Sequence, residues 1–191
     1  MHLTRMRVAC LAVLFSLGGA PVASAQEPVS EPVTTVEADL IAAEEDRLLR
    51  EMQRFRKETN RVRLLMGKRR VRLTSDPAAF ATTLDHARFL RNAWRARLLR
   101  TKKRFHRPPH LAAWRCIHRY EGPWTDPNRP YFGGLQMDLA FQRMYGRSLL
   151  RRRGTANRWT RWEQMWVAER AYRSGRGFYP WPNTARYCGL I

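Results

Sequence analysis

Residues 114–136, WRCIHRYEGPWTDPNRPYFGGLQ, combine a cysteine, a lone glutamate, several aromatic residues and a Gly-Gly pair in one short segment. A helix from about residue 109 to 121 is predicted to lead into it, because one helical face collects Leu111, Trp114, Ile117 and Glu121. The Gly-Pro pair at 122–123 stops that helix. Glu121 is therefore expected at the end of a helix and at the rim of a hydrophobic core.

A glutamate in this position suits acid catalysis. Partial desolvation favours the protonated form of a carboxylic acid, which lets it donate a proton to a leaving oxygen, as the cleavage of a glycosidic bond requires. The helical spacing is also compatible with a solvated glutamate at a helix end. Spacing alone therefore leaves both interpretations of Glu121 open.

The Gly-Gly block that follows has two interpretations as well. Gly133 and Gly134 let a backbone turn sharply and approach a ligand closely, and Gln136 offers both a donor and an acceptor to a sugar. An ordinary hairpin or loop has the same signature. Three aromatic residues in turn-like surroundings either fill the core or stack on sugar faces: Trp124, Tyr131 and Trp181.

An ordered set of motifs runs through residues 109–191: Trp114-x-Cys116, Glu121, Trp124, the block Tyr131-Phe132-Gly133-Gly134-Leu135-Gln136, Trp181-Pro182 and Cys188. This set resembles the resuscitation-promoting factor family of lysozyme-like, peptidoglycan-cleaving domains. The resemblance implies a small, mainly α-helical, α+β lysozyme-like domain with Glu121 as its general acid/base. The residues expected to contact substrate are Trp124, Tyr131, Gly133, Gly134, Gln136 and Trp181.

The resemblance also implies that peptidoglycan glycan strands are the substrate. Glu121 would protonate the oxygen between N-acetylmuramic acid and N-acetylglucosamine, and then deprotonate water (a muramidase) or the sugar's own 6-hydroxyl (a lytic transglycosylase). A two-carboxylate glycosidase would instead need Asp126 or Asp138 about 5 to 9 Å from Glu121. Helix chemistry is predicted to occupy the remaining acids: Glu163 in a capping box with Thr160, and Glu169 in a pair with Arg173.

The first 25 residues read as a secretory signal peptide, with a basic start, an apolar run at 8–20 and an Ala-Ser-Ala cleavage site at 23–25. The mature chain is expected to begin at Gln26 and to act outside the cytoplasm, in association with the cell wall. No cofactor or metal site is predicted, since no phosphate loop is evident and the five histidines lack zinc-like spacing with cysteines.

Removal of this leader takes away Cys10 and leaves Cys116 and Cys188. A disulfide can form and persist between them in an exported protein. A nucleophilic cysteine is the rival interpretation of Cys116, but the nearby base His118 is two residues away and points elsewhere on a helix. We therefore predict a disulfide-closed domain.

Charge divides the mature chain into three parts. Residues 26–46 hold seven acids and no Lys or Arg, residues 47–107 hold 20 Lys and Arg against four acids, and residues 108–191 hold 14 against five. The net charge of the whole chain is +20. Such an excess predicts a polyanionic partner or surface.

Residues 26–35 are expected to be a disordered acidic lead-in, and residues 36–107 a basic helical hairpin with coiled-coil-like character. The first helix, from about residue 36 to 70, has a weak heptad seam of Ile41, Leu48, Phe55 and Val62. Asp76 and Pro77 are predicted to cap and start the second helix. Its apolar stripe consists of Leu84, Ala87, Phe89, Leu90, Trp94 and Leu98.

The prolines at 108–109 are predicted to separate this basic hairpin from residues 109–191. Its basic faces form either a solvated surface or a surface for anionic wall polymers or membrane. Specific nucleic-acid binding is disfavoured, because a secreted chain meets little nucleic acid and no recognised nucleic-acid motif is present. Nothing in the pattern predicts an oligomeric state.

Two functions thus follow from the sequence. The first is a secreted peptidoglycan-cleaving glycosidase that uses Glu121. The alternative is a non-catalytic cell-wall-binding or signalling protein that retains the fold. Residues 125–130, TDPNRP, favour the alternative because the family has an Asn- and Gly-rich loop at this point.

Overall fold

A computed structural model describes residues 34–191. The predicted signal peptide (1–25) and most of the predicted acidic lead-in (26–33) lie outside the described residues. Residues 35–191 form one compact unit. None of the helices in this part of the chain combines the length and the apolar character needed to cross a bilayer.

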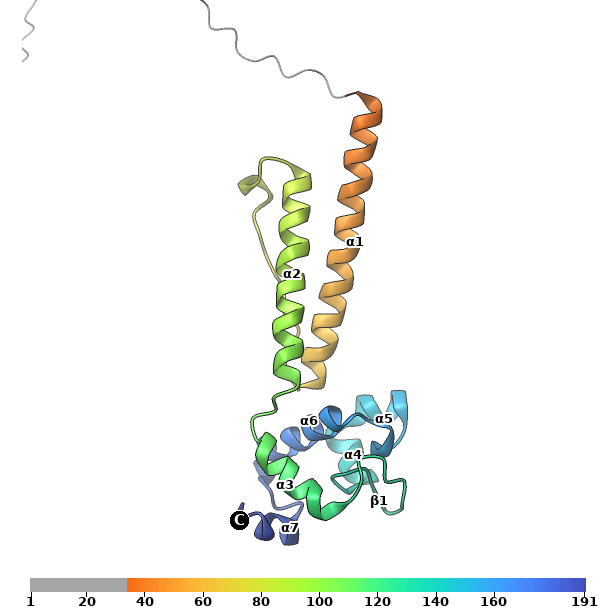
Figure 1. Ribbon diagram of the computed structural model, residues 1–191, viewed down its shortest axis with the longest axis vertical. Coiled ribbons are helices and arrows are strands. Elements are labelled where there is room, and N and C mark those ends of the chain that lie inside the picture. Colours follow the sequence, from red (N-terminus) through yellow and green to blue (C-terminus); the bar gives the residue numbers. More distant parts are fainter. Residues whose placement is uncertain (1–33) are drawn as a thin grey trace, which may run out of the picture. The chain divides into compact units, whose positions relative to one another are not determined.

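Two long helices, α1 (Thr35–Leu65) and α2 (Thr83–Phe105), lie side by side (Figure 1). The first helix ends five residues earlier than predicted, since Gly67 adopts φ +68° and the Lys68 N–H donates to the Arg63 carbonyl. This left-handed glycine and its backbone bond close the C-terminus of α1.

The two helices run in the same direction, so the predicted hairpin is wrong (Figure 1). Thr83 at the start of α2 donates to Glu45 near the start of α1, and Arg91 pairs with Glu51 further along. Residues 66–82, which we call the return segment, run back alongside the helices before α2 begins (Figure 1). When extended, residues 66–82 can span more than the roughly 35 Å length of the 23-residue helix α2. They can therefore connect the end of α1 to the start of a parallel α2.

The predicted cap at Asp76 starts a different element. The Asp76 side chain accepts from the Ala78 N–H and opens η1 (Pro77–Ala79), a single 3₁₀ turn that ends at the extended residue Phe80. The start of α2 is capped instead by Thr82, whose hydroxyl accepts from the Asp85 N–H. The Asp-Pro signal was therefore correct for a helical turn but wrong for this helix.

Half of the ten residues in the predicted apolar stripes are buried: Leu48 and Val62 on α1, with Ala87, Trp94 and Leu98 on α2. Met52 of α1 is buried as well. Two members of the predicted stripes are substantially exposed, Ile41 at 40% and Phe89 at 44%. The Phe89 ring instead packs on Phe80 of the return segment, with centroids 5.0 Å apart.

The remainder of the chain is mainly helical, as predicted, with one antiparallel hairpin. The elements are α3 (Leu111–Glu121), β1 (Tyr131–Phe132), β2 (Met137–Asp138), α4 (Leu139–Tyr145), α5 (Arg147–Arg153), η2 (Ala156–Arg158), α6 (Arg161–Ala171), the π-helical η3 (Tyr172–Arg176) and α7 (Pro182–Tyr187). In the hairpin Tyr131 pairs with Asp138 and Phe132 with Met137. The hairpin directly follows the helix that carries Glu121.

Helix α6 is the centre of this fold. Eight of its residues are buried, and they face different directions around the helix. It opens with the predicted capping box, in which the Thr160 hydroxyl accepts from the Glu163 N–H and the Glu163 carboxylate accepts from the Thr160 N–H. Trp114 and Ile117 of α3 are fully buried in the same core.

The C-terminal ends of α1 and α2 join this core. The Trp166 indole donates to the Phe105 carbonyl at 2.8 Å, and the Arg170 guanidinium donates to the Leu65 carbonyl at 2.6 Å. Burial, together with the neighbouring Arg173, lowers the pKa of Arg170 to about 10. The prolines at 108–109 therefore connect two parts that share packed side chains.

The predicted disulfide is present between Cys116 of α3 and Cys188, the residue after α7, with Cα atoms 6.0 Å apart. Residues 182–187 form helix α7, an element that was not predicted from the sequence. Pro182 occupies its first turn, a position that proline favours because its fixed φ suits the helix and its missing N–H would lack a partner there. The bridge holds α7 against α3.

Candidate functional site

Glu121 is the last residue of α3, as predicted, and its side chain is half-buried. The Thr184 hydroxyl donates to Oε1 of Glu121 at 2.7 Å. No other hydrogen bond to this carboxyl occurs within residues 34–191. One oxygen of the carboxyl is thus held by a neutral donor while the group remains open to the surface.

Thr184 was not singled out from the sequence. It lies on α7 and is itself buried, 63 positions from Glu121. The Trp-Pro pair at 181–182 signals a helix start and could have placed a helix there. Nothing local indicates that this helix faces Glu121.

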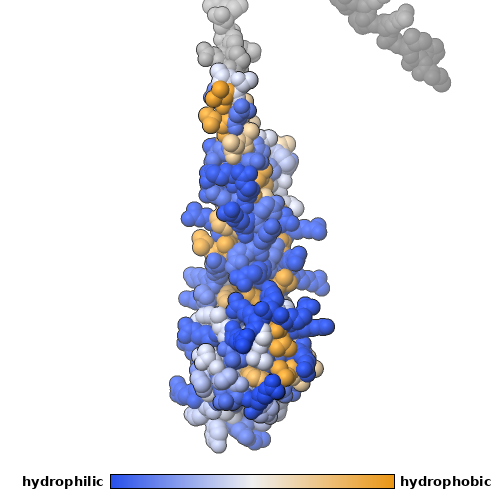
Figure 2. Space-filling model, turned by 90° about the vertical axis from the view of Figure 1, so that its right-hand side faces the viewer, coloured by the Kyte–Doolittle hydropathy of each residue, from blue (hydrophilic) through white to orange (hydrophobic). Residues whose placement is uncertain are grey.

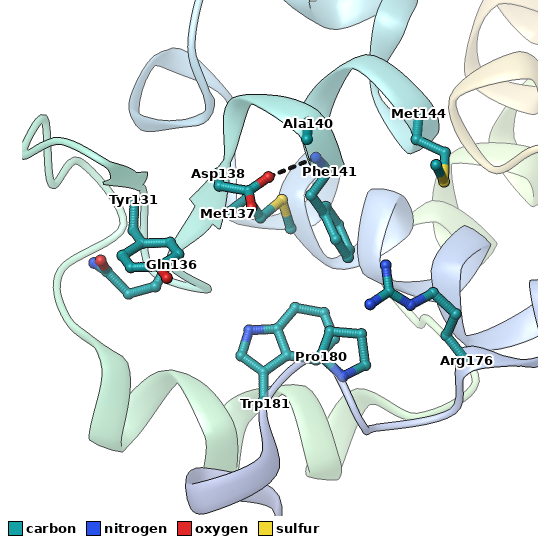
Figure 3. Close-up of a pocket in the computed structure, with 10 residues that line it drawn as sticks. All are labelled: Tyr131, Gln136, Met137, Asp138, Ala140, Phe141, Met144, Arg176, Pro180 and Trp181. Atoms are coloured by element: carbon teal, nitrogen blue, oxygen red, sulfur yellow. Dashed lines mark hydrogen bonds between the residues drawn. The ribbon is translucent and has the colours of Figure 1, made fainter.

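A surface groove begins at Glu121. One hollow of about 350 Å³ is lined by Glu121, Tyr131, Gln136, Pro180, Trp181, Pro182 and Asn183. A second hollow of about 230 Å³ shares four of these residues and extends to Met144 and Arg176 (Figure 3). Because Tyr131, Gln136, Pro180 and Trp181 line both, the two hollows adjoin, and we call them together the groove.

Three of the predicted substrate contacts line this groove. Tyr131 is 49% exposed, so its ring face is available to a ligand. Gln136 adopts φ +44°, a left-handed conformation unusual for a side-chain-bearing residue, and its amide donates to Asp126 and to the Gly133 carbonyl. Trp181 is 4% exposed and its indole N–H donates to the Leu135 carbonyl, so little of its ring is accessible to a ligand.

The other three predicted contacts lie outside the groove lining. Trp124 stacks on His118, with ring centroids 3.9 Å apart. A Cβ on Gly133 would lie 2.5 Å from the Gln164 side chain, and one on Gly134 would lie 2.6 Å from the His118 ring. Both glycines are therefore required by packing beneath the groove.

The two acids considered as partners for Glu121 have structural duties. Asp126 accepts the Gln136 amide at 2.7 Å. Asp138 caps α4 by accepting the Phe141 N–H at 2.6 Å, a contact visible in Figure 3. Of the two, only Asp138 lines the groove, in the hollow that does not contain Glu121.

Glu169 does not form the predicted pair with Arg173. Its carboxylate is fully buried and accepts from the His110 backbone N–H and the Trp114 indole N–H, each at 2.8 Å, while the His110 ring lies 3.2 Å away. Arg173 donates instead to the Glu169 backbone carbonyl. The prediction was wrong because α6 is surrounded by protein, so Glu169 faces α3 and anchors its N-terminus.

Glu169→Gln is expected to lower the free energy of unfolding by about 1 to 2 kcal/mol, because the buried hydrogen bonds from the His110 and Trp114 N–H groups, both accepted by Oε1, lose their charged acceptor. Urea unfolding followed by circular dichroism measures this change. Asp46→Asn, which alters an ion pair between two exposed side chains of α1, is the matched control and should cost under about 0.5 kcal/mol. Equal effects of the two substitutions would contradict the anchoring role.

Within residues 34–191 no group of three or more His, Cys, Asp or Glu side chains is arranged to hold a metal ion. Comparisons with known proteins add no identification. No family model matches the sequence, and neither the curated proteins nor the solved structures contain a significant match.

Proposed function

We propose that this chain is a secreted, cell-wall-associated glycosidase that cleaves peptidoglycan, with Glu121 as its general acid/base. The observation that carries the proposal is the half-buried carboxyl of Glu121, held by Thr184 at one end of a groove with an exposed aromatic ring and amide groups. Aromatic faces and amides are the groups that bind sugars.

The order of the elements also supports a lysozyme-like domain. A helix that ends on Glu121 leads into a short antiparallel hairpin, and both pack against the buried helix α6. This arrangement agrees with the fold that the resemblance to resuscitation-promoting factors implies. The predicted leader and the disulfide between Cys116 and Cys188 support action outside the cytoplasm.

In the proposed mechanism a glycan strand lies along the groove. The protonated Glu121 carboxyl gives its proton to the oxygen between N-acetylmuramic acid and N-acetylglucosamine, and the glycosidic bond breaks with the electron pair leaving on that oxygen. The resulting carboxylate then accepts a proton from water or from the 6-hydroxyl of the muramic acid. As it does so, the oxygen of that water or hydroxyl bonds to the anomeric carbon. Asp126 accepts a hydrogen bond from Gln136 and Asp138 accepts one from the Phe141 N–H. These interactions favour the single-carboxylate mechanism over a two-carboxylate one.

The test is mass spectrometry of the soluble muropeptides released from purified peptidoglycan by residues 26–191. Anhydro-muramyl products would identify a lytic transglycosylase, and reducing-end products a muramidase. No release from any wall type, with binding retained, would replace the proposal by a non-catalytic wall-binding protein.

Thr184→Val is expected to slow muropeptide release about five- to tenfold, the equivalent of one hydrogen bond of about 1 kcal/mol that orients the carboxyl. Thr184→Ser keeps the donor and should restore most of the rate. Initial rates of release from the same peptidoglycan compare the two variants. If both variants lost the rate equally, packing at α7 and not the hydrogen bond to Glu121 would be responsible.

A further inference from the structure

Another hollow, of about 710 Å³ and separate from the groove, lies between α1, the return segment and α5. Its α1 residues recur at helical spacing on one face: Gln53, Arg56, Lys57, Asn60, Arg61 and Leu64. The return segment adds Arg70, Val71 and Arg72, and α5 adds Arg152. We call these ten residues the basic pocket.

The charge of the basic pocket is largely uncompensated. Six of its ten lining residues are Arg or Lys and none is acidic. Arg61 forms an ion pair with Glu58, which lies outside the lining. No ion pair to any of the other five cations occurs within residues 34–191. Like charges gathered in one concave site attract an anion with several charges.

Specific hydrogen bonds hold the return segment in this position. The Val71 N–H donates to the Asn60 side chain at 2.8 Å, and the Asn60 amide donates to the Val71 carbonyl at 3.3 Å. Arg63 donates to the Arg69 carbonyl at 2.9 Å. Because these contacts fix the backbone on both sides of residue 70, Arg70 and Arg72 are brought to the cations of α1 before any ligand binds.

The lining also indicates the class of anion. Guanidinium groups bind phosphate oxygens through paired hydrogen bonds, and five of the six cations are arginines. No aromatic side chain lines the basic pocket, so it offers no platform on which nucleic-acid bases could stack. Hydrophilic side chains cover much of the face of the molecule shown in Figure 2.

We propose that the basic pocket binds closely spaced phosphate groups, as in a polyphosphate chain or a lipid headgroup with two phosphates. None of the ten residues lines the groove at Glu121, so the inference does not depend on the proposed glycosidase activity. Arg152 comes from α5, so such a ligand would contact both the α1–α2 pair and the C-terminal part of the fold.

Calorimetric titration of the full chain with inorganic tripolyphosphate in 150 mM salt tests the proposal. Arg70→Gln/Arg72→Gln is expected to weaken binding at least about tenfold. Lys103→Gln/Arg104→Gln, which removes two exposed cations of α2 outside the basic pocket, is the matched control and should weaken it less than about twofold. Unchanged melting temperatures of the ligand-free variants establish that both are folded.

Two further binding measurements identify the source of the phosphates. Vesicles of phosphatidylcholine with cardiolipin, whose headgroup carries two phosphates, test the lipid, and an oligothymidylate of matched charge tests nucleic acid. Loss of tripolyphosphate binding or of vesicle binding in the Arg70/Arg72 variant alone supports the site. Equal losses in both double variants, no binding of either phosphate probe, or tighter binding of the oligothymidylate than of both would overturn the proposal.

Discussion

Replacing Glu121 by glutamine is expected to lower the rate of muropeptide release by about 10²- to 10⁴-fold, the usual contribution of a positioned general acid/base. Glutamine keeps the shape of the side chain and an oxygen that accepts from Thr184. It cannot give a proton to the glycosidic oxygen or remove one from the attacking hydroxyl. Initial rates from mass spectrometry of released muropeptides measure the loss.

The same substitution should leave binding and folding nearly unchanged. Glu121 is half-buried and receives one hydrogen bond within the described residues, so its amide should shift the melting temperature by only a few degrees. Co-sedimentation with insoluble peptidoglycan measures binding. Asp46→Asn makes the same chemical change on the exposed surface of α1 and serves as the control for activity.

Three results would separate the possibilities. A large loss of release with binding retained supports Glu121 as the acid/base. Undiminished release by Glu121→Gln would remove this residue from the mechanism. Absence of release by the unmodified chain, with binding to the wall intact, would favour the non-catalytic alternative that the segment 125–130 suggests.

The second large effect concerns the disulfide. Cys116→Ser/Cys188→Ser is expected to lower the free energy of unfolding by about 4 kcal/mol, because the bridge joins residues 72 positions apart and restricts the unfolded chain. For a compact unit of this size the melting temperature should fall by roughly 10 °C. Differential scanning calorimetry in the absence of reductant measures the shift.

A reductant provides the matched control. It should lower the melting temperature of the unmodified protein toward that of the double serine variant and leave the variant unchanged. Activity should fall as well, because the bridge holds α7, and with it Thr184, against the helix that ends on Glu121. Equal melting temperatures of the oxidised protein and the variant would contradict a stabilising role for the bridge.

Several features of the fold were predictable because their causes are local. The end of α3 at Glu121 follows from the Gly-Pro pair after it, and the capping box of α6 follows from the spacing of Thr160 and Glu163. The cysteine pair was predictable from the two cysteines that remain outside the predicted leader. In each case neighbouring residues, or a choice among very few partners, determine the result.

Other features depended on contacts between distant segments. The sequence suggested a hairpin because two amphipathic helices joined by a turn signal usually fold back on each other. The long return segment makes a parallel pair instead, and its bonds to Asn60 bring Arg70 and Arg72 to α1. The choice between these connections rests on tertiary contacts that no periodicity encodes.

By itself the sequence determined a mainly helical chain with a strongly basic middle section, a helix ending on Glu121 and one available pair of cysteines. Only the tertiary structure decided that Thr184 reaches this glutamate and that Glu169 is buried beneath α3. It also decided that Gly133 and Gly134 are packing positions while Tyr131 and Gln136 line the groove. The physical reason is that helix ends, caps and charge are set by near neighbours, whereas the surroundings of a side chain are set by segments that meet only when the chain folds.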